Sequence, residues 1–136
     1  MFVVFFALFF KLLCKFIYWK MNKIMSKIID LAELSDVRYE FVCPGLSDAV
    51  AFDKINALKM IEVFRFECCS IKGVDVWSIK NHNVETVIPP GLWIERFENE
   101  TNKEFLYRSC DETFEFINNF PKYTFGLHFE FMIDEI

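Results

Sequence analysis

The sequence has little glycine and little histidine, and this scarcity excludes several kinds of active site. Its 136 residues include four glycines and two histidines. No glycine cluster precedes an expected helix, so the chain lacks a phosphate-binding loop. His82 and His128 lie far apart in sequence, and the five cysteines have no CxxC spacing, so no zinc site is expected. We therefore expect no cofactor, no metal and no enzymatic activity.

The cysteine pattern also argues against a disulfide framework. Five is an odd number, the spacing is irregular, and a domain of this length can form a core without covalent cross-links. Nothing around these cysteines resembles a nucleophile turn, and a buried cysteine usually acts as a small apolar residue. The simplest interpretation is a protein of a reducing compartment, the bacterial cytoplasm.

No uninterrupted apolar run is long enough to span a bilayer. The run over residues 2–10 is followed by Lys11 and Lys15, each of which costs about 2.5–3.5 kcal/mol at mid-membrane. Residues 1–21 also lack the basic start and the small-residue cleavage site of a signal peptide. Three interpretations stay open: an interfacial or signal-anchor helix, an apolar helix packed on the domain, or translation from Met21 or Met25. We favour the last, with residues 22–136 forming a single domain.

Basic residues are scarce beyond the N-terminal segment. Residues 1–27 carry five lysines and no acid, whereas residues 28–136 carry 10 basic and 20 acidic residues. An acidic body argues against nucleic-acid binding, because each phosphate contact requires a lysine or arginine. The charge instead suits a soluble protein or one that binds a basic partner.

The first half of the body shows alternating helix and strand patterns. Apolar residues at helical spacing predict a helix over residues 22–34, and period-two alternation predicts a strand over residues 37–43. Ser47 is the expected cap of a second helix that ends near Lys59, with Ala51, Phe52, Ile55 and Leu58 as its buried stripe. Residues 61–71 and 74–79 read as a hairpin that turns at Lys72 and Gly73.

The second half is expected to contain most of the sheet. Residues 84–110 read as a meander of three strands with turns at residues 89–91 and 99–103. A short helix should run from Asp111 to near Phe120, before a final strand over residues 123–133. This last strand is expected to be central, with its buried row formed by Phe125, Leu127, Phe129, Phe131 and Ile133. On the opposite face, His128 and Glu130 are expected to be an exposed pair, with a catalytic base as the alternative.

These patterns predict an α+β domain with a mostly antiparallel sheet of five to seven strands. Two to three helices should pack on one face, beside an apolar N-terminal helical segment. In size, acidity and fold class the chain resembles the immunity proteins of bacterial toxin systems, a comparison that rests on no motif.

A cluster of acidic residues in the second half is the candidate site for a basic protein partner, such as a toxin. If one face of the meander is exposed, Trp93, Phe97 or Tyr107 is the expected aromatic anchor beside it. The candidate partner-binding residues are Trp93, Glu95, Glu98, Glu100, Glu104, Asp111, Glu112 and Glu115. Two alternatives remain: a membrane-associated accessory protein anchored by residues 1–21 at the inner membrane, and a small enzyme or ligand-binding domain with an unrecognised pocket.

Overall fold

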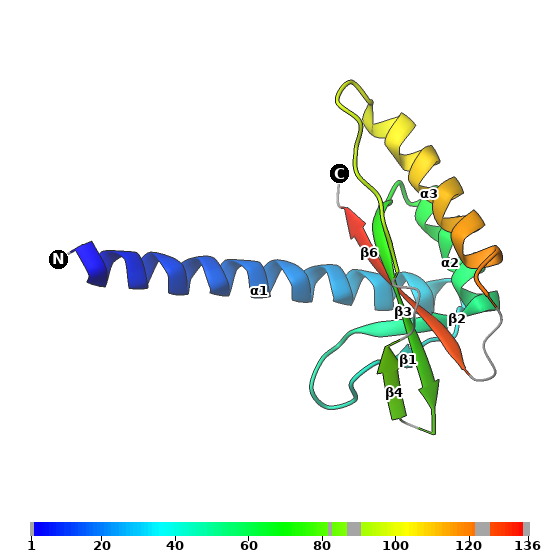
Figure 1. Ribbon diagram of the computed structural model, residues 1–136, viewed down its shortest axis with the longest axis horizontal. Coiled ribbons are helices and arrows are strands. Elements are labelled where there is room, and N and C mark those ends of the chain that lie inside the picture. The colour runs from blue at the N-terminus through cyan, green and yellow to red at the C-terminus, as the bar shows by residue number, and fades with distance from the viewer. Residues whose placement is uncertain (1, 82, 87–90, 122–125, 135–136) are drawn as a thin grey trace.

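The described residues form three helices and six strands, and one helix projects far from the rest (Figure 1). The computed structural model describes residues 2–81, 83–86, 91–121 and 126–134. The elements in chain order are α1 (Phe2–Leu34), β1 (Glu40–Phe41), β2 (Val50–Asp53), α2 (Lys54–Phe66), β3 (Ser70–Lys80), β4 (Asn83–Thr86), β5 (Leu92–Trp93), α3 (Asn102–Asn118) and β6 (Leu127–Asp134). The α+β class is as the sequence predicts.

The sheet is antiparallel, and its strands lie in the order β1-β2-β6-β3-β4, with β5 pairing along another part of β3. Strand β6 therefore lies between β2 and β3, and its expected central place is confirmed. Phe129, Phe131 and Ile133 are buried as the period-two pattern predicts, and Leu127 is half-buried. Phe125 and Thr124 lie outside the described residues.

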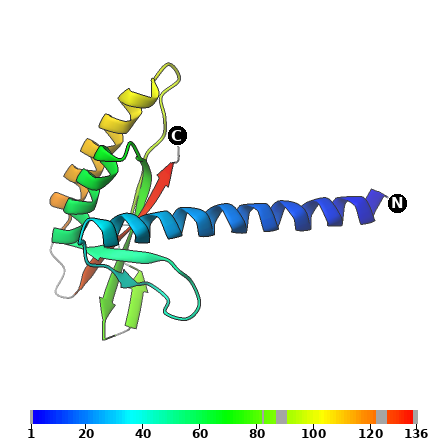
Figure 2. The ribbon, with the colours of Figure 1, turned by 180° about the vertical axis from the view of Figure 1, so that it is seen from behind.

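Helices α2 and α3 lie side by side on one face of the sheet, as both ribbon views show (Figure 2). They enclose the main core, in which Phe64 of α2 meets Phe131 of β6 with ring centroids 5.2 Å apart. The last turns of α1 join this core through Ile28, Leu31 and Ala32. Across the sheet, a smaller apolar cluster forms around Val42, Ala49, Ala51 and Ile79.

Helix α1 is continuous from Phe2 to Leu34, so the helix expected over residues 22–34 is its C-terminal part. Side chains 6–20 are exposed, and burial begins only where the helix reaches the body. No helix among the described residues has the length and apolar character needed to cross a membrane.

The expected helix that begins at Ser47 is wrong. Ala51 and Phe52 belong to strand β2, where both are fully buried because β2 is covered on both faces. Helix α2 begins after them, with Asp53 as the cap whose carboxylate accepts a hydrogen bond from the Asn56 backbone N–H. Consequently Ile55, expected in the buried stripe, is 69 % exposed.

The expected hairpin over residues 61–79 is also wrong. Residues 61–66 continue α2, and one long strand, β3, passes straight through Lys72 and Gly73. The register against β6 shifts between Ile71 and Gly73, which places a β-bulge where the turn was expected. Glycine is needed there because a Cβ on Gly73 would lie 2.8 Å from the Leu92 carbonyl oxygen and 2.9 Å from Met132 Cε.

The three-strand meander is only partly present. Strands β4 and β5 pair with β3, but the expected third strand is the first half of helix α3. The short helix expected from Asp111 is the second half of the same helix. The strand expected over residues 37–43 is reduced to Glu40–Phe41, and Phe41 is exposed. Most of the turn expected at residues 89–91 lies outside the described residues.

A candidate protein-binding surface on the β5–α3 loop and helix α3

The segment between β5 and α3 is an ordered loop that the body holds at several points. Strand β5 pairs with β3 through Trp93 opposite Gly73, and the Ile94 N–H donates to the Lys72 carbonyl at 2.7 Å. Ile94 is buried, whereas Trp93 is 63 % exposed. Further along, the Glu100 N–H donates to the Phe97 carbonyl at 3.2 Å, which closes a turn. The loop therefore presents its side chains from a fixed backbone.

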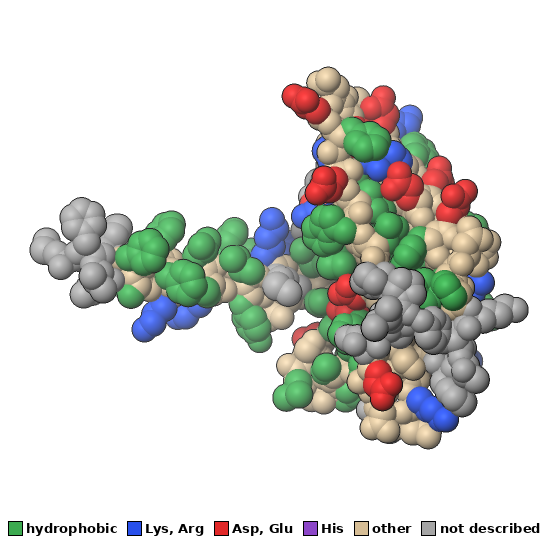
Figure 3. Space-filling view, in the orientation of Figure 1, with side chains coloured by type: hydrophobic (Ala, Val, Ile, Leu, Met, Phe, Trp, Pro, Cys, Tyr) green, Lys and Arg blue, Asp and Glu red, His purple; other side chains and the backbone are tan. Residues whose placement is uncertain are grey.

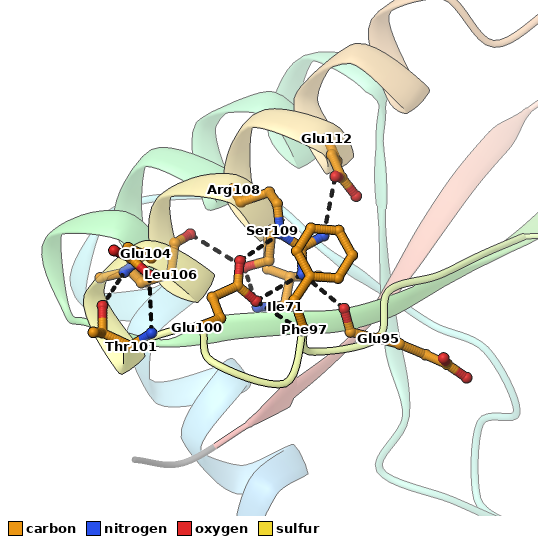
Figure 4. A network of polar contacts seen from close by, with 10 residues as sticks. All are labelled: Ile71, Glu95, Phe97, Glu100, Thr101, Glu104, Leu106, Arg108, Ser109 and Glu112. Atoms are coloured by element: carbon orange, nitrogen blue, oxygen red, sulfur yellow. Dashed lines mark hydrogen bonds and ion pairs between the residues drawn. The ribbon is translucent and has the colours of Figure 1, made fainter.

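Arg108 of α3 is the centre of the polar network that fixes this loop (Figure 4). Its guanidinium donates twice to the Glu100 carboxylate, at 2.6 and 2.8 Å, and once to the Glu95 carbonyl at 2.7 Å. It also binds Glu112 one helical turn later, at 3.0 Å. The ring of Phe97 covers it, 3.9 Å from the guanidinium carbon. A bidentate arginine–carboxylate pair beneath an aromatic ring is both strong and directional.

The pKa of Glu100 reflects this network. The hydrogen bonds from Arg108 lower the pKa of the Glu100 carboxyl from 4.5 to about 2, and the Phe97 backbone N–H adds to the effect. The Glu100 side chain is only 7 % exposed. Glu100 is therefore a structural carboxylate that stays charged at neutral pH, and it offers little surface to a partner.

Glu104 closes the N-terminus of α3. The Thr101 hydroxyl accepts from the Glu104 backbone N–H at 3.1 Å, and the Glu104 carboxylate accepts from the Thr101 N–H at 3.0 Å. This reciprocal pair is a capping box, which satisfies two backbone donors at the helix start. The turn expected between strands at these residues is therefore wrong, and their Thr-x-x-Glu spacing is the sequence signal for a helix start.

Asp111 and Glu112 connect α3 to its neighbours. Asp111 accepts from Arg65 of α2 at 2.8 Å, and Glu112 accepts from Arg108. Both carboxylates remain partly exposed, with 70 % and 46 % of their side chains accessible. Internal arginines therefore neutralise these two acids in part.

Three of the predicted acids remain fully on the surface. Within the part of the chain that the structure describes, the carboxylates of Glu95, Glu98 and Glu115 are exposed and have no hydrogen bond or ion pair. Figure 3 shows acidic side chains interspersed with apolar ones over this part of the body. We use the name loop–helix surface for residues 92–101 together with the solvent-exposed residues of α3.

A hollow of about 460 Å³ lies on this surface between β5 and the second half of α3. Leu92 and Phe116 supply an apolar floor, and Glu112 and Glu115 supply carboxylates beside it. A lysine or arginine side chain matches this chemistry, because its aliphatic stem packs on apolar groups while its charged end stays near the acids.

The comparisons with known proteins agree with a protein-binding function. The family model described as immunity protein 40 matches residues 39–133, most of the chain. The chain belongs to the immunity protein 40 family. No curated protein and no solved structure matches it. Membership of an immunity-protein family supports a non-enzymatic inhibitor that acts by binding a protein partner, as the comparison by size, acidity and fold class suggested.

The matched range includes the whole loop–helix surface and excludes α1. The surface therefore belongs to the part of the chain that defines this immunity-protein family.

Sequence reasoning missed the residues that hold this surface in place. In the sequence alone, Arg108 cannot be distinguished from an ordinary surface charge. Ser109 is fully buried, and its hydroxyl accepts from the Ile71 N–H at 3.1 Å while donating to the Leu106 carbonyl. It thereby attaches α3 to β3 beside the bulge. No local pattern could reveal a bond across 38 residues of sequence.

The alternative site at His128 and Glu130 is not an exposed pair in this immunity-family member. His128 is 8 % exposed and lies 3.8 Å from Glu40, while Glu130 accepts from the Trp77 indole N–H at 2.7 Å. Burial raises the pKa of Glu130. The two side chains thus have separate partners, and neither holds the other as a catalytic base would require.

The two buried thiols are not activated, and the larger groove carries mixed charge. Burial raises the pKa of Cys69, and it raises that of Cys110 to about 11, so neither is an activated thiolate. A groove of about 840 Å³ between α2 and α3 combines charges of both signs with Phe66, which is 86 % exposed. No group of three or more potential metal ligands occurs within the described ranges.

Proposed function

We propose that this protein neutralises a basic toxin by binding it through the loop–helix surface. The observation that supports this most directly is the set of exposed carboxylates, Glu95, Glu98 and Glu115, on a loop and helix that Arg108 holds together. Family membership supports a protein partner, and the charge of this surface supports a basic one.

The fixed backbone supports tight binding as well as attraction. Because Ile94, Glu100 and the capping box already hold the loop, little conformational entropy is lost when a partner docks. Trp93 and Phe97 are 63 % and 62 % exposed, which makes them candidate aromatic anchors beside the acids. The hollow between Glu112 and Glu115 would take a lysine or arginine from the toxin.

Binding would occlude the toxin and requires no chemistry from this chain. The cytoplasm is the proposed location, in keeping with Cys14, Cys43 and Cys68, which are exposed free thiols. A partner of this kind would associate rapidly and with strong dependence on salt, because exposed charges are screened beyond about 10 Å at about 0.1 M ionic strength.

Charge reversal on the loop–helix surface tests the proposal. Protein partners are captured from the source cell with wild type and with Glu98→Lys plus Glu115→Lys, and affinity for the recovered partner is then measured at about 0.1 M and about 1 M salt. We expect the reversal to weaken binding roughly ten-fold or more, because two attractions become repulsions. Glu104 is left unchanged, since its reversal would break the capping box.

The matched control is Asp48→Lys plus Glu85→Lys, which makes the same change in net charge. Asp48 precedes β2 and Glu85 lies on β4, away from α3, and both are exposed. This variant should bind as wild type does, whereas Trp93→Ala should weaken binding by about 2 kcal/mol. Equal losses from both charge reversals, or a partner that is acidic, would overturn the proposed surface.

A further inference from the structure

Helix α1 exposes a large apolar surface that the body does not cover. Large apolar side chains from Phe6 to Trp19 are between 44 % and 72 % exposed, and contact with the core starts only near Ile24 and Ile28. The ribbon views show this part of the helix extending clear of the domain (Figures 1 and 2). An exposed apolar surface of this extent is typical of an interaction site for a protein or a membrane.

The charge on α1 distinguishes between these occupants. Lys11, Lys15, Lys20, Lys23 and Lys27 lie on this helix, and no acidic residue precedes Asp30. If the exposed parts of two α1 helices lay side by side, their lysines would come together with no carboxylate among them, because the acids of α1 lie only at its end in the body. A surface of anionic lipid headgroups supplies the missing negative charge, and each basic residue near it adds to binding.

Over residues 9–18 the spacing suits a helix that lies in the plane of the membrane surface, whereas Lys20, Lys23 and Lys27 follow nearer the body on the side of the apolar stripe. Lys11 and Lys15 are one turn apart on one side, with Tyr18 next along the same side. Phe9, Leu13 and Phe16 follow one another at helical spacing on the other side. With this stripe in the acyl region, the two lysines reach the headgroups.

The junction with the body has the composition of a membrane–water interface. Tyr18 and Trp19 are 69 % and 60 % exposed, and the Lys23 ammonium lies 5.5 Å from the centroid of the Trp19 ring. Aromatic rings of this kind prefer the headgroup level, where their polar groups stay hydrated. The strongly acidic body beyond residue 27 would be repelled by anionic headgroups and held off the surface.

We propose that α1 binds in-plane to anionic lipid bilayers and anchors this protein at a membrane surface. The exposed stretch over residues 6–20 is about 22 Å long, so it lies as a short rod across the headgroups. Because α1 lies outside the family-matched range, this anchor is separate from the toxin-binding surface and each can fail without the other.

Vesicle flotation of the full chain tests the proposal. One set of vesicles contains about three parts phosphatidylcholine to one part phosphatidylglycerol, and the other contains phosphatidylcholine alone. We expect wild type to float more strongly with the anionic vesicles than with the neutral ones. Phe9→Glu plus Phe16→Glu should reduce this flotation at least ten-fold. Lys11→Ser plus Lys15→Ser should weaken binding to the anionic vesicles roughly 20-fold and change little on the neutral ones.

Phe66→Glu plus Phe114→Glu is the matched control, since it places the same two charges on exposed phenylalanines of α2 and α3. Its flotation should equal that of wild type, and every variant should still unfold cooperatively. Absence of flotation with anionic vesicles would overturn the anchor, as would flotation that the α1 substitutions leave unchanged. A lipid-free dimer that dissociates in Phe9→Glu plus Phe16→Glu would assign the apolar stripe to a second copy instead.

Discussion

Helices α1 and α3 both expose aromatic side chains, but they differ in charge and in attachment to the body. Helix α3 buries one side along its length, through residues such as Phe105, Cys110 and Ile117, and its exposed side carries acids. Helix α1 buries only its last turns, and its exposed part carries lysines. The difference indicates that exposed aromatic residues alone do not identify a partner. The charge of the side chains around them is what distinguishes a basic protein from an anionic membrane.

The first half of α1 and the whole of α3 should therefore contribute very differently to stability. Phe105 is 2 % exposed and lies 4.8 Å from the Arg96 guanidinium, whereas Phe16 is 58 % exposed. Phe105→Ala should lower the free energy of unfolding by about 3–5 kcal/mol. Phe16→Ala, the matched substitution on α1, should change it by about 0.5 kcal/mol or less. Urea unfolding measures both, and equal losses would mean that α1 packs on the body over its whole length.

The contrast between the two helices also explains why one was predicted well and the other poorly. Residues 22–34 of α1 combine apolar residues at helical spacing with charges elsewhere, which is a clear helical pattern. In α3 the buried side includes Ser109, Cys110 and Thr113, so its stripe does not read as apolar. The alternation of Phe105 and Tyr107 then favoured a strand, although the capping box indicated a helix start.

The errors around α2 and β3 have a tertiary cause. The end of α2 is rich in β-branched and aromatic residues, whose local preference is for a strand. Packing on the sheet overrides this preference and keeps the segment helical. Gly73 resembled a turn residue, but it is glycine because β5 and β6 approach it closely. Such contacts depend on strand order, which local sequence does not determine. The central strand β6 was predictable because its alternation needs no neighbour to be recognised.

The candidate site was predictable as a region and not as a set of contacts. The candidate acids are clustered in one stretch of the sequence, and in the structure they lie on one loop and one helix. The sequence alone does not show that Arg108 and Glu100 form a structural ion pair, because charged residues of this kind usually lie on the surface without a fixed partner. Which acids face a partner therefore depends on which ones the arginines already hold.

The Arg108 network attaches α3 to the loop, and α1 has no such attachment. Loss of this network should lower stability by an intermediate amount. Arg108→Ala should lower the free energy of unfolding at neutral pH by less than Phe105→Ala does, since charged hydrogen bonds to Glu100 are lost. The pKa of Glu100 is about 2 in the folded protein and 4.5 ordinarily, so this stabilisation is complete above pH 4.5 and falls as pH drops toward 2.

Urea unfolding of wild type and Arg108→Ala from neutral pH down to about pH 2 measures this effect, and the two curves should converge on acidification. Lys103→Ala, an exposed neighbour in the first turn of α3, is the control and should change stability by about 0.5 kcal/mol or less. A gap between wild type and Arg108→Ala that stays constant with pH would show that Glu100 is not the main partner of Arg108.

The smallest effect is expected from removing the exposed part of α1 altogether. A chain that starts at Met21 keeps Ile24, Ile28 and Leu31, the residues through which α1 joins the core. Side chains 6–20 make no contribution to that core, so the free energy of unfolding should change by about 0.5 kcal/mol or less. A chain that starts at Ile29 loses Ile28, which is 2 % exposed, and should be less stable by about 2–5 kcal/mol. Early melting of the Met21 chain would place the apolar half of α1 in the fold, and the division between a core-forming end and a lipid-binding end would then be wrong.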